Sequence, residues 1–76
     1  MRELVEFLAR SLVEEPDQVK VTELRRDQAT VLELQVAPAD LGKVIGRQGR
    51  TARAIRTLLA AASSRGGHRY ILDILD

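Results

Sequence analysis

Two glycines, Gly46 and Gly49, separate a short apolar segment from a longer amphipathic one in the second half of the chain. They belong to the run Val-Ile-Gly-Arg-Gln-Gly-Arg at residues 44–50, which contains no acid. Glycine adopts positive φ without strain, and it has no Cβ to hold a ligand away from the backbone. A tight turn between two helices is therefore the strongest constraint that the sequence places on its fold.

Hydrophobic periodicity on both sides of this turn predicts the element order α-β-β-α-α-β. Apolar residues at three- and four-residue spacing indicate helices, and apolar residues at alternate positions indicate strands. The predicted elements are helices over residues 2–14, 39–45 and 50–62, and strands over residues 18–25, 29–36 and 68–75. Pro16 and Pro38 bound the first helix and the second strand, because proline disfavours a helical predecessor and cannot donate to a sheet. Residues 63–67, Ser-Ser-Arg-Gly-Gly, are expected to end the last helix with a glycine cap.

Each predicted element has one apolar face. The face of the first helix is expected to contain Leu4, Leu8, Ser11 and Leu12, widened by Val5 and Phe7. The face of the last helix is expected to contain Ala52, Ile55, Leu58, Leu59 and Ala62, opposite Arg50, Arg53 and Arg56. Leu24 falls out of phase in the first strand, which predicts either a bulge or an early strand end.

These elements predict an α+β fold with a three-stranded mixed sheet and three helices packed on one face. The first two strands form an antiparallel hairpin through a turn at residues 26–28. The second and third strands are joined by a helical crossover, which connects parallel strands. The 76 residues are expected to form a single small domain.

Composition narrows the class of protein. The chain has no cysteine for a disulfide or a thiolate metal site, and it has a single histidine. No apolar run approaches the roughly 18 residues that a membrane span requires. We therefore expect a soluble cytoplasmic protein with no cofactor, no metal and no membrane partner. A Ser/His/Asp or Cys/His set is not expected, so an enzyme is disfavoured.

The charges are distributed unevenly. Residues 1–40 carry five Lys/Arg and nine Asp/Glu, whereas residues 41–76 carry seven Lys/Arg and two Asp/Glu. The two parts have net charges of −4 and +5, and no acid lies between Leu41 and Leu72. This asymmetry points to an anionic partner for the second part of the chain.

The glycine turn has the composition of a phosphate site. The free N–H groups and positive dipole at the start of the 50–62 helix favour an anion. Arg47 in the turn, with Lys43, Arg50 and Arg53 beside it, supplies positive charge. The plainer alternative is that the glycines only connect two helices tightly. The Walker and dinucleotide-binding spacings are both absent.

The run from Val44 to Arg50, followed by Ile55, resembles the signature of KH domains, in which a GXXG loop joins two helices. The predicted element order is similar to the type II, or prokaryotic, KH fold. A chain this short, with Leu-Gly-Lys ahead of the signature, resembles the small bacterial KhpA group. The resemblance covers nearly the whole chain. It implies a non-catalytic module that clamps about four nucleotides of single-stranded RNA, or sometimes DNA.

The resemblance also implies roles for individual residues. Gly46, Arg47, Gln48 and Gly49 would contact the nucleic-acid backbone, and Ile45 would line an apolar groove for bases, with Val44 or Leu41 beside it. It further implies RNA-chaperone or post-transcriptional activity and pairing with itself or with a second KH protein, KhpB (also called Jag). The rival hypothesis is a protein-interaction module whose glycine turn packs on a partner chain. Acids in place of both glycines are expected to abolish RNA binding and to leave the fold intact.

Overall fold

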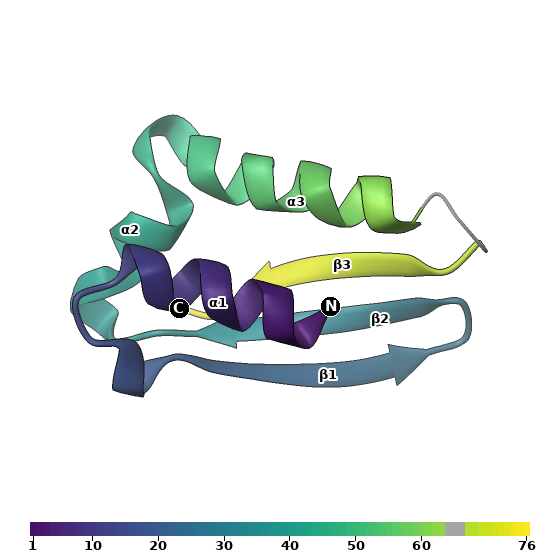
Figure 1. Cartoon of the computed structure of the whole chain (residues 1–76), viewed down its shortest axis with the longest axis horizontal. Helices are drawn as coiled ribbons and strands as arrows, with labels where there is room; N and C mark the ends of the chain where they lie inside the picture. The colour runs from purple at the N-terminus through teal and green to yellow at the C-terminus, as the bar shows by residue number, and fades with distance from the viewer. Residues whose placement is uncertain (64–66) are drawn as a thin grey trace.

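The computed structural model describes residues 1–63 and 67–76, which form the predicted α-β-β-α-α-β order (Figure 1). The helices are α1 (Arg2–Leu12), α2 (Leu41–Ile45) and α3 (Arg50–Ser63). The strands are β1 (Lys20–Arg26), β2 (Ala29–Gln35) and β3 (Arg69–Ile74). Short 3-10 turns precede β1, α2 and α3: η1 (Pro16–Gln18), η2 (Pro38–Asp40) and η3 (Arg47–Gly49).

The central strand of the sheet is β2. It pairs antiparallel with β1 and parallel with β3, so the strand order is β1-β2-β3. The α1, α2 and α3 helices lie on one side of this sheet (Figure 1). The burial of β2 alternates accordingly, since Leu32 and Leu34 are fully buried whereas Val31 and Glu33 are half-buried. The predicted mixed sheet with helices on one face is confirmed.

The core lies between the sheet and the helices. It is built from aliphatic side chains, among which Val5, Leu32, Leu34, Val44 and Leu59 are almost completely buried. Burying one such side chain stabilises the fold by about 1.5–3 kcal/mol. A chain with no tryptophan and a single phenylalanine therefore relies on close packing of branched side chains.

The first helix differs from its prediction in length and in orientation. It ends at Leu12, because the N–H of Val13 makes the last helical bond, to the Ala9 carbonyl. The N–H groups of Glu14 and Glu15 donate instead to the carboxylate of Asp40, at 3.2 and 3.0 Å. Its most buried residues are Val5 and Ala9. The predicted stripe was wrong for Leu4, Phe7, Ser11 and Leu12, all of which are exposed.

Leu58 on α3 was also predicted to be in the core, but 51% of it is exposed. Together with Phe7 on α1, which is 67% exposed, it leaves apolar surface on the helical side of the molecule. Helical periodicity identifies the apolar side of a helix. It does not show which residues of a wide apolar side pack against the sheet and which stay exposed.

Leu24 causes neither a bulge nor an early strand end. Within the described residues, β1 pairs with β2 without interruption, and Leu24 lies opposite Val31. The leucine is out of phase because it belongs to the face of the sheet turned away from the helices. The strand also begins at Lys20, later than the predicted residue 18. The η1 turn, which starts at Pro16, extends through Gln18 and occupies the predicted start of the strand.

The remaining differences are at element ends. The predicted helix over 39–45 is divided into η2 and α2. The bounds of β2 and α3 differ from the prediction by one residue at one end, and those of β3 by one residue at each end. The expected cap of α3 falls largely on residues 64–66, including Arg65, which lie outside the described residues. No helix within residues 1–63 or 67–76 is long and apolar enough to cross a membrane.

Candidate nucleic-acid interface

The glycine run forms a reversal between α2 and α3. Gly46 has φ 78° and ψ 170°, a conformation that only glycine adopts readily, and Gly49 has φ 75°. Gln48 between them is also left-handed, at φ 57° and ψ 26°. The Gly46 N–H donates to the Gly42 carbonyl at 2.8 Å, and the Gly49 N–H donates to the Gly46 carbonyl at 3.1 Å. The predicted turn between two helices is therefore confirmed.

The two glycines have different surroundings. A Cβ on Gly46 would lie 2.7 Å from the backbone nitrogen of Thr51, closer than real Cβ atoms approach other atoms. At Gly49, no described atom lies within 4 Å of such a Cβ. Gly46 is thus required for the turn to pack against α3, whereas Gly49 leaves open space outside the turn. The expectation that acids at both glycines would leave the fold intact is wrong for Gly46.

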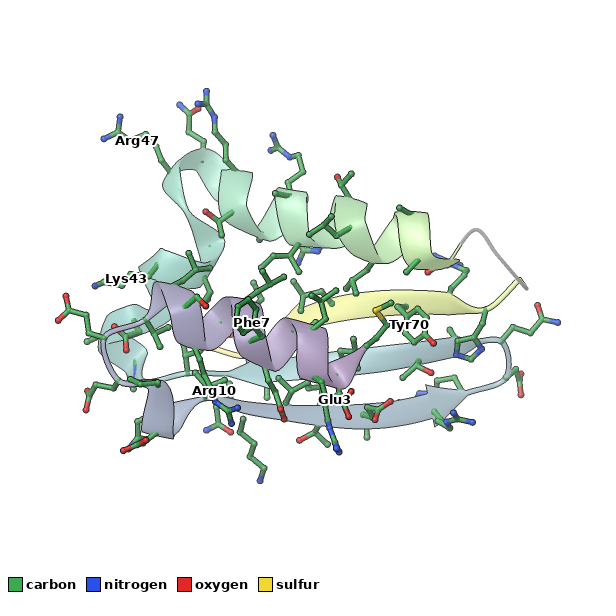
Figure 2. The ribbon with its side chains drawn as sticks, in the orientation of Figure 1. Glu3, Phe7, Arg10, Lys43, Arg47 and Tyr70 are labelled. Atoms are coloured by element: carbon green, nitrogen blue, oxygen red, sulfur yellow. The ribbon has the colours of Figure 1, made fainter. Side chains whose placement is uncertain are left out.

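The tip of the turn projects from the molecule. Arg47 and Gln48 are exposed, and Figure 2 shows the Arg47 side chain pointing away from the helices at the tip. The backbone carbonyl of Gln48 accepts a hydrogen bond from Arg53 Nη2 at 3.4 Å. Its side-chain oxygen accepts one from Arg50 Nη2 at 3.5 Å. The structure therefore brings together four of the predicted site residues at one exposed point.

The guanidinium groups at this tip have no acidic partner among residues 1–63 and 67–76. Among the described residues, no ion pair joins Arg47, Arg50 or Arg53 to a carboxylate. The two bonds of Arg50 and Arg53 to Gln48 are long and solvent-exposed, so they are easily exchanged for stronger bonds to an anion. The N-terminus of the 14-residue α3 helix carries the positive end of the helix dipole, and it adds to the positive potential of the arginines at the tip.

Lys43 lies apart from these arginines. Its Nζ is 3.7 Å from Asp40 Oδ1 and 3.8 Å from Glu14 Oε2. Figure 2 shows Lys43 beside the end of α1, away from the tip where Arg47 projects. Asp40 is only 2% exposed and joins Lys43 to the backbone after α1. Sequence reasoning missed this link. An aspartate directly before a helix predicts a cap of that helix, but Asp40 makes no side-chain cap bond to α2 and accepts instead from the backbone after α1.

The apolar residues of α2 divide into a buried and an accessible set. Val44 is fully buried, so it packs in the core and is not accessible at the surface. Leu41 and Ile45 are half-buried and lie one helical turn apart, on the same side of α2. A Cβ on Gly42, between them in sequence, would meet no described atom within 4 Å. This side of α2 offers an accessible apolar surface directly before the turn.

A hollow near the N-terminal end of α2 was not predicted. It has a volume of about 310 Å³ and includes Leu41, Val36, Pro38 and Leu75 in its lining. Its residues come from three parts of the chain: the end of η1, the segment from the end of β2 into α2, and the residues after β3. The pairing of β2 with both β1 and β3 brings these parts together, so no local pattern could have indicated the hollow.

His68 lies at the opposite end of the sheet from the turn. Its Nε2 is 2.6 Å from the hydroxyl of Thr30, which is buried, and its ring packs edge-on against Tyr70 at a centroid distance of 5.2 Å. These contacts give the histidine a packing role at the start of β3.

Comparisons with known proteins agree with this geometry. The sequence profile of the family described as "KhpA/KhpB, KH domain" matches residues 2–74. The "RNA-binding protein KhpA" of Clostridium acetobutylicum is 49% identical over 75 residues, which cover 99% of this chain and 100% of that protein. The protein of the same name from Aquifex aeolicus is 49% identical over 76 residues, covering 100% of this chain and 96% of the relative. The protein of that name from Borreliella burgdorferi is 50% identical over 74 residues, which cover 97% of this chain and 90% of the relative. With its type II order of helices and strands and its glycine turn between α2 and α3, the chain belongs to the KhpA/KhpB family of KH domains.

Proposed function

We propose that this chain is a non-catalytic single-stranded RNA-binding protein whose turn from Gly46 to Gly49 clamps the nucleic-acid backbone. The observation that carries the proposal is an exposed turn whose arginines have no acidic partner within the described residues. The names of the three relatives, each an RNA-binding protein, support the choice of RNA.

The phosphate contacts would come from backbone and side chains together. The N–H groups of Arg47 and Gln48 stand at the start of the η3 turn, where a short helix supplies no internal acceptor. Because Gly49 has no side chain and open space beside it, a phosphate can approach these amides closely. Arg47, Arg50 and Arg53 would then bind phosphate oxygens through their guanidinium forks.

The bases would lie along the accessible side of α2. Ile45 and Leu41 provide apolar contact, and Gly42 leaves room for a planar ring. Val44 has no part in this surface because it is fully buried. Lys43 contributes least to the interface, because two carboxylates already lie within 3.8 Å of its ammonium group.

Further parts of the proposal follow from family membership. The chain would act in the cytoplasm as an RNA chaperone or post-transcriptional regulator. It would pair with itself or with a second KH protein such as KhpB. One short KH domain contacts about four nucleotides, so two linked domains would gain affinity through effective concentration.

The first test is direct binding of a labelled single-stranded RNA of about eight nucleotides. We expect binding at about 50 mM salt that weakens about 20-fold at about 200 mM, the result of roughly three phosphate contacts. Single-stranded DNA and duplex RNA of the same sequence are the matched controls. No RNA binding at the lower salt would favour the protein-interaction alternative, and equal binding of single-stranded DNA would broaden the substrate class.

A further inference from the structure

The hollow beside the start of α2 lies where all three strands have an end. At this end of the sheet β1 begins and β2 and β3 stop, on the same side of the molecule as α2 (Figure 1). The β3 ladder continues to the wall of the hollow, since the Leu75 N–H donates to the Leu34 carbonyl at 2.9 Å. The volume of about 310 Å³ is at the lower end of the range for small-ligand sites. The lining has four apolar and three polar residues: Val36, Pro38, Leu41 and Leu75, and Gln18, Gln35 and Asp76.

The three polar side chains of the hollow are free to bind a ligand. Within residues 1–63 and 67–76, no side-chain hydrogen bond or ion pair includes Gln18, Gln35 or Asp76. Each glutamine amide offers both donors and an acceptor, whereas the carboxylate offers acceptors only. Among the described residues that line the hollow, none is lysine or arginine, so a phosphate would meet a carboxylate with no cation to offset it. The hollow therefore suits a neutral ligand, in contrast to the arginines at the tip of the turn.

Leu41 connects the hollow to the accessible side of α2. It lines the hollow, and it shares one side of α2 with Ile45, along which the bases of bound RNA are proposed to lie. Because α2 has only five residues, the hollow is about 7.5 Å along the helix from the glycine turn. A KH domain contacts about four nucleotides, so one RNA segment can reach both places.

We propose that the hollow is a base-specific subsite that takes one adenine of the bound RNA. This inference rests on the RNA binding proposed above, and it adds a position at which the RNA sequence is read. The four apolar side chains contact the faces of the ring. A glutamine amide pairs bidentately with adenine, because its oxygen accepts from N6 and its nitrogen donates to N7. The Watson–Crick edge of adenine, with N6 and N1, offers the same pattern to the second glutamine.

The lining of the hollow distinguishes adenine from the other bases. Uracil has no amino group, and its carbonyl oxygens repel the carboxylate of Asp76. Guanine offers donors to that carboxylate, but its other edge has only the acceptors O6 and N7, so the glutamine oxygens stay unpaired. Cytosine has one edge with an amino group beside an acceptor, where adenine has two. Adenine alone therefore pairs with both Gln18 and Gln35.

Binding of four RNAs tests this assignment. Each has about eight nucleotides and is uracil throughout, except for one central position that is adenine, cytosine, guanine or uracil. We expect the adenine RNA to bind about tenfold more tightly than the all-uracil RNA. The double variant Gln18→Ala with Gln35→Ala should reduce this preference to less than about twofold. Its affinity for the all-uracil RNA should not change, because the phosphate contacts lie at the tip of the turn.

Two controls accompany this measurement. Gln28→Ala removes an exposed glutamine in the hairpin turn at the other end of the sheet, and it should keep the full preference for adenine. In NMR spectra of the wild-type chain, the side-chain amide signals of Gln18 and Gln35 should shift with the adenine RNA. The corresponding signals of Gln28 should stay in place.

Four results would overturn the proposal. Equal affinities of the wild-type chain for all four RNAs would exclude the subsite and leave the proposed RNA binding intact. A preference for adenine that survives in the double variant would show that the base is read elsewhere. A preference for guanine or cytosine that the double variant loses would exclude adenine as the occupant. Failure to bind any of the four RNAs at low salt would overturn both the subsite and the proposed function.

Discussion

Helix α1 and the segment from the glycine turn into α3 both expose arginines, but they use them differently. Arg2 and Arg10 on α1 each have a nitrogen 3.8 Å from the carboxylate of Glu6, one helical turn away. Within the part of the chain that the structure describes, the guanidinium groups of Arg50 and Arg53 reach only oxygens of Gln48 in the turn. The spacing of acids, rather than the number of arginines, therefore decides which positive charges are available to a partner.

The largest expected effect is on stability, and it differs between the two glycines of the turn. Gly46→Ala introduces a Cβ next to Thr51 in a conformation that only glycine adopts readily, and it should lower the free energy of unfolding by about 2–5 kcal/mol. Gly49→Ala meets open space and should cost about 1–2 kcal/mol, from the left-handed backbone alone. Urea denaturation measures both. Equal losses would contradict the account of how the turn packs on α3.

A smaller effect is expected on RNA affinity when an arginine of the turn segment or an arginine of α1 is replaced. Arg53→Ala should weaken single-stranded RNA binding by about three- to tenfold and reduce the salt slope by about 0.7, the share of one phosphate contact. Arg10→Ala on α1 is the control and should leave both quantities unchanged within error. Titrations of both variants at several salt concentrations test this. A similar loss for the two would mean that binding depends on net charge and not on the turn.

The smallest effect is expected at Lys43. Because Asp40 and Glu14 already neutralise its ammonium group, Lys43→Ala should change RNA affinity by less than about twofold. The same titration measures it. A loss as large as that of Arg53→Ala would show that the lysine leaves its acids and joins the phosphate contacts.

Much of the fold could be predicted because its signals are local. Alternation in β2, helical spacing in α3 and the glycine pair each lie within about fifteen residues, where periodicity is informative. The parallel direction of the second and third strands then followed from the rule that helical crossovers join parallel strands. The candidate site was predicted for the same reason, since the turn and its arginines are contiguous in sequence.

The features that were missed depend on contacts between distant segments. Asp40 accepts backbone N–H groups just after α1 that are 25 and 26 residues away in sequence. Leu58 was assigned to the core, but the buried side of α3 is formed by Ala52, Ile55 and Leu59, and Leu58 is exposed beside it. Leu24 was out of phase with the alternation expected for a strand that has one apolar face, because it belongs to the face of the sheet turned away from the helices. In each case the deciding contact is tertiary, and no local propensity encodes it.

The central claim is that the exposed tip of the turn holds the RNA backbone. Its most direct test is the double variant Arg47→Asp with Gln48→Asp, measured for single-stranded RNA binding at low salt. Both side chains are exposed, and aspartate tolerates the left-handed conformation of position 48, so the fold should be retained. Circular dichroism and urea denaturation check this. We predict at least about a hundredfold loss of affinity, because two carboxylates replace the expected phosphate contacts. Unchanged affinity in the folded variant would contradict the claim.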